Sequence, residues 1–568
     1  MIIGIDLGTT NSLAAVWRDG EAVLIPNALG QFLTPSVVGE ADDGSILVGQ
    51  AARDRLITHP GSATAAFKRY MGTTRQVSVG RKSYRPEELS ALVLRSLKAD
   101  AEAFLGGEVT EAIITVPAYF NDAQRKATKA AGQLAGLKVD RLLTEPTAAA
   151  LAYGFATGDE ESTVLVVDLG GGTLDVSLLH SFEGIMEVKA TAGDIWLGGE
   201  DFTDVIVQGF LAEAGKAAGL ADVALDTQVY ATLRRQAEIA KRTLSEAGEA
   251  KVEFNYNGKP ITWGLTRERY EQMAEPLLAK VRLPLDRALR DARIAPDEIM
   301  RIVFAGGATR MPMFRRMVSR LFRQLPVQHI NPDEVVGRGA AVRVGLLEKS
   351  KGLEEHVLTD VSPFTLGIGI SSDESGVVLH GLYLPIIERN TVIPTSRSHI
   401  VQTMSNQQRQ VHVKIYQGEA RMVSDNVFLG ELTIDVPPAP AGEEKLDVRF
   451  SYDTSGLLDV DVTVLSTKRQ MNLVIEGNPG VLTAAEVAER LAKLGKLKIH
   501  PRDEAQNIAV VSRAKRVFEE HLGLMRTRIG EMLDGFMAIV EGQDADRIRE
   551  AREVLTKFLD SVDRDILV

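Results

Sequence analysis

The fold of this chain is decided by two glycine-rich stretches, Asp6-Leu7-Gly8-Thr9-Thr10-Asn11 and Asp168-Leu169-Gly170-Gly171-Gly172-Thr173-Leu174-Asp175. Each follows an apolar run typical of a β-strand, at residues 2–5 and 163–167. Glycine lets the backbone approach a ligand closely, so that successive N–H groups point at phosphate oxygens while the aspartate holds a hydrated cation. One such loop alone fits a tight turn with a solvated aspartate equally well. Two of them, facing each other across a cleft, predict a site for the β- and γ-phosphates of a nucleotide.

A third glycine pair, Gly306-Gly307, follows the apolar run 301–304 and precedes a helical pattern. Its flat backbone would suit an adenine or a ribose. The chain contains neither the P-loop motif nor the dinucleotide fingerprint, so a different phosphate cradle is required. Around these turns, strand-like runs alternate with helical ones such as 86–104, and residues 12–25 read as a hairpin. We therefore expect an α/β architecture up to about residue 350.

After this region the pattern changes twice. Residues 349–361 are first charged and then apolar, which predicts a linker with the core Val357-Leu358-Thr359-Asp360-Val361. Residues 366–475 carry short alternating runs between turns, which favour a β-sandwich. A capping box at Thr483 and Glu486 then opens a helical tail, whose last apolar stripe contains Ile548, Leu555, Leu559 and Val562. We expect four parts, at residues 1–355, 356–361, 362–481 and 482–568.

Composition excludes several classes of protein. The length of 568 residues is too great for a single small module, and 45% hydrophobic with 25% charged residues is typical of globular proteins. A net charge of -12 argues against nucleic acid as the main partner. The absence of cysteine excludes disulfides, thiol nucleophiles and thiolate metal sites. No apolar run is long enough for a membrane span and no leader pattern precedes Ile2, so we expect a cytoplasmic protein.

The three glycine turns resemble the phosphate-one, phosphate-two and adenosine motifs of the actin, hexokinase and DnaK superfamily. Further segments resemble DnaK-type heat-shock chaperones of the seventy-kilodalton class: 116–125, 145–150, 197–202, 331–334, 390–394 and 417–419. The resemblance implies a two-lobed actin-like ATPase domain, a β-sandwich peptide-binding domain and a short α-helical lid. It is most like the short-lid bacterial HscC subgroup, because the helical tail is short and lacks an acidic terminal motif.

The resemblance also implies the site residues. Asp6, Glu145 and Asp168 would organise hydrated Mg²⁺ beside ATP or ADP, with K⁺ as a further cation. Lys68 would stabilise the transition state of hydrolysis, and Asp175 would lie close to the phosphates. The remaining nucleotide contacts implied by the family are Gly8, Thr9, Thr10, Asn11, Gly170, Gly171, Gly172, Thr173, Gly198, Gly199, Glu200, Glu238, Lys241, Arg242, Ser245, Gly306, Gly307, Arg310 and Asp333. Without the resemblance, the helical spacing of Glu238 to Ser245 would indicate only a solvated, ion-paired face.

Two further groups follow from the family. Pro117 and Arg125 would relay the nucleotide state to the linker residues Leu358 and Asp360, although a proline after a strand can simply end it. The peptide groove would be formed by Ile368, Val401, Met404, Val411 and Val413. For Val413, a place in the sandwich core explains the residue almost as well.

Several departures from the family pattern affect these expectations. Thr359 interrupts the apolar linker run, and the segment between Ser245 and Thr266 is short. Residues 371–376 look like a loop of more than typical length. The implied partners are unfolded or extended apolar peptides, a J-domain co-chaperone and a nucleotide exchange factor, with no membrane. Two alternatives remain open on the same ATPase fold: a small-molecule kinase and an actin-like filament ATPase.

Overall fold

The computed structural model describes residues 1–154, 161–182, 185–218, 220, 227–256, 259–327, 329–348, 357–374, 377–453, 456–475, 505–520 and 523–564. The chain splits into two compact units. The first contains residues 1–364 and the short segment 389–393, and the second contains residues 365–388 and 394–568. The predicted domain boundaries at 355/356 and 481/482 lie outside the described residues. The four-part division of the chain therefore stays a prediction.

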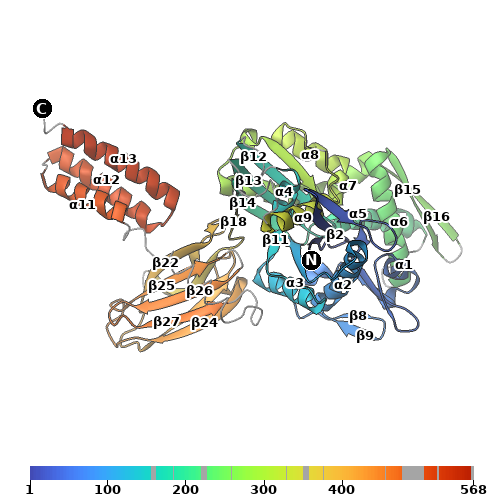
Figure 1. Ribbon diagram of the computed structural model, residues 1–568, viewed down its shortest axis with the longest axis horizontal. Helices are drawn as coiled ribbons and strands as arrows, with labels where there is room; N and C mark the ends of the chain where they lie inside the picture. Colours follow the sequence, from blue (N-terminus) through green and yellow to red (C-terminus); the bar gives the residue numbers. More distant parts are fainter. Residues whose placement is uncertain are drawn as a thin grey trace. The chain divides into compact units, whose positions relative to one another are not determined.

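The first unit contains two α/β lobes (Figure 1). The sheet of lobe I is formed, in order, by β11 (Leu142–Thr144), β10 (Glu111–Val116), β1 (Ile2–Asp6), β2 (Asn11–Arg18) and β3 (Glu21–Ile25), with β4 (Thr34–Pro35) paired to β2. Two small sheets accompany it: β6 (Ile46–Val48), β5 (Val37–Glu40) and β7 (Ala63–Ala65), and then β8 (Val77–Val79) with β9 (Lys82–Tyr84). Its helices are α1 (Gln50–Thr58), α2 (Pro86–Leu105), α3 (Asp122–Leu134), α4 (Glu145–Ala152) and α9 (Val335–Leu347).

Lobe II repeats the same plan. Its sheet runs β17 (Arg301–Ala305), β12 (Ser162–Leu169), β13 (Leu174–Phe182), β14 (Ile185–Asp194), β18 (Val357–Val361) and β21 (Val392–Ile393). In each lobe three consecutive antiparallel strands are joined by a parallel strand, β10 beside β1 and β17 beside β12. The other elements are β15 (Glu249–Tyr256), β16 (Lys259–Thr266), α5 (Gly199–Phe210), α6 (Thr227–Glu246), α7 (Arg267–Ala292) and α8 (Pro312–Phe322). The two lobes therefore share one strand arrangement.

Local sequence explains several of these elements. The hairpin of β2 and β3 turns at Asp19 and Gly20, which both have positive φ. Helix α2 begins at Pro86, where a missing N–H costs nothing, and ends at Gly106 in the left-handed conformation. Helix α3 is capped by Asn121, whose side chain accepts a hydrogen bond from the N–H of Gln124. The two predicted aspartate loops thus follow the strands that the sequence indicates.

The residues predicted as a linker form a strand of the first unit. Val357–Val361 is β18, which pairs in parallel with β14 and antiparallel with β21. Asn390, just before β21, accepts a hydrogen bond from the N–H of Thr191 on β14, at 3.0 Å. The side-chain hydroxyl of Thr359 is buried and has no hydrogen-bond partner among the described residues. An unsatisfied buried hydroxyl weakens this strand, in line with the departure noted in the sequence.

We expect Thr359→Val to strengthen the pairing of β18 with β14. Removing a buried hydroxyl that lacks a partner should recover about 1–3 kcal/mol, which slows the opening of the strand by about 5- to 150-fold. Hydrogen exchange of the β18 amides, followed by mass spectrometry, measures this. Thr262→Val places the same change on an exposed position of β16 and should leave exchange unaltered. Equal exchange rates in wild type and Thr359→Val would show that the hydroxyl is satisfied by water.

The second unit begins with two four-stranded antiparallel sheets. One is formed by β20 (Val377–Ile387), β19 (Leu366–Glu374), β23 (Gln410–Gln417) and β24 (Val427–Asp435), and the other by β22 (Thr395–Gln402), β25 (Lys445–Tyr452), β26 (Leu458–Val464) and β27 (Gln470–Ile475). Alternate residues of their strands are buried, among them Ile415, Leu432, Phe450 and Val460. This confirms the predicted β-sandwich.

The expectation of a long loop at residues 371–376 is wrong for its first four residues. Ser371 to Glu374 continue β19 and pair with His380 to Val377 of β20. Their polar side chains resemble a loop in the sequence, but the apolar partner strand provides backbone hydrogen bonds. The last two residues, 375 and 376, lie outside the described part of the chain.

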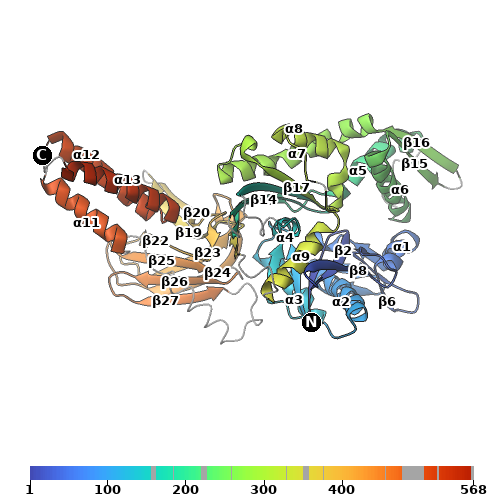
Figure 2. The same cartoon turned by 45° about the horizontal axis from the view of Figure 1, so that its top comes forward.

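The tail forms three helices, α11 (Ala505–Glu520), α12 (Gly523–Glu541) and α13 (Ala545–Arg564), which pack on one another (Figure 2). All four residues of the predicted stripe, Ile548, Leu555, Leu559 and Val562, are buried in this bundle. The predicted capping box at Thr483 and Glu486 lies outside the described residues. No helix in the described ranges is both long enough and apolar enough to cross a membrane.

Candidate nucleotide site

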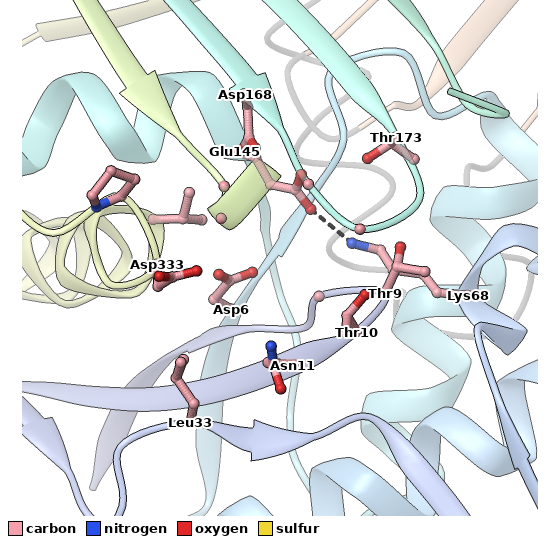
Figure 3. Close-up of a pocket in the computed structure, with 17 residues that line it drawn as sticks. Asp6, Thr9, Thr10, Asn11, Leu33, Lys68, Glu145, Asp168, Thr173 and Asp333 are labelled. Carbon is pink, nitrogen blue, oxygen red and sulfur yellow. Dashed lines mark hydrogen bonds and ion pairs between the residues drawn. The ribbon is translucent and has the colours of Figure 1, made fainter. Parts of the chain in front are cut away.

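Side chains from both lobes of the first unit converge on one pocket (Figure 3). Strand β1 ends at Asp6 and β12 carries Asp168 next to its last residue, so both aspartates lie where a strand passes into a glycine loop. The predicted residues that line the pocket are Asp6, Gly8, Thr9, Thr10, Asn11, Lys68, Glu145, Asp168, Gly170, Gly171, Thr173, Gly306, Gly307 and Asp333. Pro332 of the family-like segment 331–334 also lines it, as do Leu33 and Val336, to which no motif in the sequence pointed.

The register of the lobe II sheet explains why the third glycine turn reaches this pocket. Asp168 of β12 pairs with Ala305 of β17, so that Gly306 follows directly beside the second aspartate loop. Gly306 has a φ of +78°, and a Cβ on it would lie 2.4 Å from the carbonyl oxygen of Leu169. A Cβ on Gly307 would lie 2.6 Å from Oδ1 of Asp333. Only glycine fits this crossing of loops.

The pocket contains a buried ion pair. Nζ of Lys68 donates a hydrogen bond to Oε1 of Glu145 at 2.7 Å, and both side chains are buried. Lys68 lies in the 3₁₀ turn Phe67–Tyr70, and Glu145 is the first residue of α4. Among the described residues that line the pocket, Lys68 is the one cation. A single ammonium group therefore faces several carboxylates.

Three aspartates at or beside the pocket have raised pKa values, so they hold their protons more strongly than free aspartates. Burial, reinforced by the negative charge of Glu145, raises the pKa of Asp6 to about 7, against the opposing charge of Lys68 and a 3.1 Å hydrogen bond from Thr115. The same two causes raise the pKa of Asp175 to about 7. Burial and the surrounding carboxylates raise the pKa of Asp168 well above its usual range. This excess of acidic groups favours binding of a cation.

The donor set fits Mg²⁺, which prefers oxygen ligands and keeps several waters. Among the described residues, no group of three acidic or histidine side chains is arranged to hold a metal ion directly. Contact through water, which the family resemblance implies, stays a prediction.

The cleft is closed in this structure. The pocket holds about 80 Å³, whereas small-molecule sites usually hold about 300–1,000 Å³. The two phosphate loops touch each other, since a Cβ on Gly171 would lie 1.8 Å from Oγ1 of Thr10. Oγ1 of Thr10 also donates a 3.5 Å hydrogen bond to Glu200 of lobe II. The lobes have to separate before a nucleotide enters.

Four predicted nucleotide contacts on one helical face, the adenosine clamp, do not line this closed pocket: Glu238, Lys241, Arg242 and Ser245. On α6, Nζ of Lys241 donates to the carbonyl oxygen of Gly199 and to Thr203, both at 2.8 Å, and it pairs with Glu238 at 2.7 Å. Burial opposes ionisation of Glu238, but the charge of Lys241 and its hydrogen bond lower the pKa of Glu238 to about 2. Arg242 donates a hydrogen bond to Glu238, and Ser245 donates one to the carbonyl oxygen of Lys241, both within α6.

The predicted nucleotide residue Arg310 lies outside the pocket lining and pairs with Asp333 at 2.8 Å. The predicted nucleotide residues Gly172, Asp175, Gly198, Gly199 and Glu200 also lie outside the pocket lining. Of these, Gly198 is the N-cap of α5, and Gly199 and Glu200 begin that helix.

Sequence reasoning missed a bridge between the lobes. Arg69 of lobe I donates to the carbonyl oxygen of Gly172 at 3.0 Å and to Asp201 of lobe II at 2.5 Å. Asp201 also accepts a hydrogen bond from the N–H of Gly198. The signal available was the position of Arg69 directly after Lys68. This bridge ties the second phosphate loop to the segment that carries Lys68.

The predicted relay residues surround the loop after β10. The N–H of Tyr119 donates to Oδ1 of Asp175 at 3.1 Å. Arg125 donates to the carbonyl oxygens of Phe120 and Ala118, at 3.0 and 3.1 Å. Burial raises the pKa of Asp360 on β18, and the positive charge of Arg125 opposes this. A continuous set of contacts thus runs from Asp175 to Arg125, which lies close to β18. Pro117 begins this loop, and the side chain of Leu358 lies outside the description.

The predicted peptide-groove residues differ in exposure. Ile368 and Val413 are buried in the sandwich, Val401 and Val411 are half-buried, and Met404 is exposed. The core interpretation of Val413 is therefore compatible with its burial. Val411 lies on the same face of β23 as the buried Val413 and Ile415, but at the more open end of the strand.

Known proteins resemble this chain over nearly its whole length. A family model described as Hsp70 protein matches residues 2–566. The chain is 39% identical to the "Chaperone protein DnaK" of Thermotoga petrophila and to that of Thermotoga maritima, over 567 residues that cover 98% of this chain and 93% of each relative. The matched family accounts for both the two-lobed α/β unit and the β-sandwich. A small-molecule kinase or an actin-like filament ATPase would leave the β-sandwich unexplained. The chain belongs to the Hsp70 family of chaperones, which bind and hydrolyse ATP and bind unfolded peptides.

Proposed function

We propose that Mg²⁺ and ATP bind in the cleft between the lobes, and that hydrolysis there switches the peptide affinity of the β-sandwich through β18. The observation that carries this proposal is the buried cluster of Asp6, Glu145 and Asp168 around a single ammonium group, between two glycine loops. The cluster has more carboxylates than cations, which favours a bound cation, and the loops offer backbone N–H groups to phosphates.

In this proposal each part of the pocket has one task. Asp6, Glu145 and Asp168 hold Mg²⁺ through water, and the cation, when bound, neutralises charge on the β- and γ-phosphates. Thr9, Thr10 and Thr173 contact the phosphates together with the loop amides. The ammonium group of Lys68 stabilises the charge that develops on the γ-phosphate. The lobes close around the nucleotide and exclude bulk water.

The coupling step uses the relay residues. Asp175 holds the N–H of Tyr119, so that a change at the phosphates moves the loop that Arg125 also contacts. Arg125 in turn acts on Asp360 of β18. A ligand shifts such an equilibrium only by its differential affinity for two states, so ATP and peptide must prefer opposite states of this strand.

Further features of the proposal rest on family membership. They are K⁺ as a second cation, a J-domain co-chaperone that stimulates hydrolysis, a nucleotide exchange factor and a place in the cytoplasm. Assignment to the short-lid HscC subgroup is supported by the three-helix tail α11–α13. The division into ATPase domain, linker, sandwich and lid is proposed as in the sequence analysis.

Binding of Mg²⁺ and ADP should release protons. Asp6 has a pKa of about 7, and burial with the neighbouring carboxylates raises the pKa of Asp168, so we expect this cluster to lose protons when it holds the cation. Affinity for Mg²⁺–ADP is therefore expected to rise as the pH increases from 6 to 8, and to level off above the raised pKa values. Isothermal titration calorimetry in buffers of different ionisation enthalpy counts the protons.

The variant Asp6→Asn should release fewer protons on binding Mg²⁺–ADP. Asp140→Asn, which neutralises an exposed aspartate outside the pocket, should match wild type. Proton release that is zero at pH 6.5, or unaffected by Asp6→Asn, would remove Asp6 from the cation site.

A further inference from the structure

A second groove lies between α7 and α8 on lobe II, and these two helices lie side by side (Figure 2). It holds about 550 Å³ and shares no lining residue with the nucleotide pocket. That volume is within the about 300–1,000 Å³ of typical binding sites. The groove therefore has room for side chains of a partner, independently of ATP.

The floor and the rim of this groove differ in chemistry. Apolar side chains from both helices line it: Leu278, Met313, Met317 and Leu321. Methionine adapts its shape to different apolar partners. Two leucines that neighbour the groove along the chain are strongly exposed, Leu283 at 66% and Leu325 at 77%. The groove therefore offers an apolar floor to a partner, and the chain beside it carries two further exposed apolar side chains.

Arginines surround this floor. Arg316 pairs with Glu271 and Arg282 with Asp286, whereas Arg320 and Arg323 are exposed and have no carboxylate partner among the described residues. The sequence has no aspartate or glutamate between Glu298 and Asp333. In a chain of net charge -12, this is a local basic region. The rim is therefore complementary to carboxylates.

The combination selects one kind of partner. A simple anion would use the arginines but leave the apolar floor and the exposed leucines in water. An apolar client segment would cover the floor but leave the guanidinium groups without partners. A helix with apolar residues at positions i, i+3, i+4 and i+7 and carboxylates on its flanks satisfies both. We propose that the α7–α8 groove binds an acidic amphipathic helix of another protein.

The test uses a defined probe and the full-length protein. The probe is a fluorescein-labelled amphipathic peptide with leucine at i, i+3, i+4 and i+7 and glutamate on both flanks, titrated by fluorescence anisotropy. The double variant Arg320→Glu with Arg323→Glu should weaken binding by at least about 10-fold, since like charges then meet at the rim. Arg95→Glu, an equal change at an exposed position of α2, should have no effect. Unchanged ATP hydrolysis and circular dichroism show that the double variant is folded.

Three outcomes would overturn the proposal. The first is equal affinity of wild type and the double variant. The second is equal binding of a peptide with glutamine in place of glutamate, or full displacement by inorganic tripolyphosphate, which would indicate a purely apolar or a purely anionic site. The third is loss of the probe in Val411→Phe, which would locate it in the β-sandwich. Because the probe should bind equally with ADP and ATP, failure here is distinguishable from failure of the nucleotide switch.

Discussion

Replacing Lys68 by alanine is expected to slow ATP hydrolysis by on the order of 100-fold or more while nucleotide still binds. Lys68 is the one cation among the described residues that line the pocket, and its ammonium group is buried, where a charge acts strongly on a developing transition state. Binding survives because the loop amides and the carboxylate-held cation remain. Single-turnover hydrolysis and equilibrium binding of a fluorescent ADP analogue separate the two effects.

The controls for this variant address its stability. Removing Lys68 leaves Glu145 buried without its partner, which costs about 3–5 kcal/mol unless Glu145 takes up a proton. Thermal unfolding with and without ADP therefore accompanies the kinetics. Lys98→Ala removes a surface lysine from α2 and should leave hydrolysis unchanged. Hydrolysis at the wild-type rate in a folded Lys68→Ala protein would remove Lys68 from the catalytic assignment.

The second large effect is expected in the β-sandwich. Val411→Phe places a ring at the open end of the interior face of β23, beyond the buried Val413 and Ile415. The ring would occupy space that an extended apolar peptide needs, so we expect peptide binding to weaken by about 10-fold or more, which is about 1.4 kcal/mol for each factor of ten. Basal ATP hydrolysis should not change, because Val411 belongs to the other compact unit. Peptide anisotropy in ADP measures the affinity.

Lys414→Phe provides the matched control, because it adds the same ring on the exposed, opposite face of β23. Peptide affinity should then equal that of wild type. If Val411→Phe also binds peptide normally, Val411 belongs to the sandwich core and the groove lies elsewhere.

Local patterns predicted much of this fold. The aspartate loops at Asp6 and Asp168 each need only a strand followed by glycine, and both are formed as expected. The hairpin at Asp19 and Gly20 and the start of α2 at Pro86 depend on backbone preferences of single residues. Such features depend on a few neighbouring residues, so they can be predicted from a single sequence.

Contacts between distant residues were less predictable. The pairing of β18 with β14 joins segments that are far apart in the chain, and the short run at Val357 looked like a linker. The polar strand from Ser371 looked like a loop because its apolar partner follows it. The bridge from Arg69 to Asp201 and the arginine-lined groove of α7 and α8 depend on tertiary packing. The local spacing of apolar and polar residues does not indicate such contacts.

The central claim is that nucleotide state sets peptide affinity, and one measurement tests it most directly. A labelled extended apolar peptide is bound to the full-length protein in excess ADP, and its anisotropy is followed after addition of excess ATP with Mg²⁺. The account predicts rapid release of the peptide. Slower release in Lys68→Ala would indicate that hydrolysis, rather than ATP binding, drives the release. Equal binding of the peptide in ADP and in ATP would contradict the proposed coupling through β18.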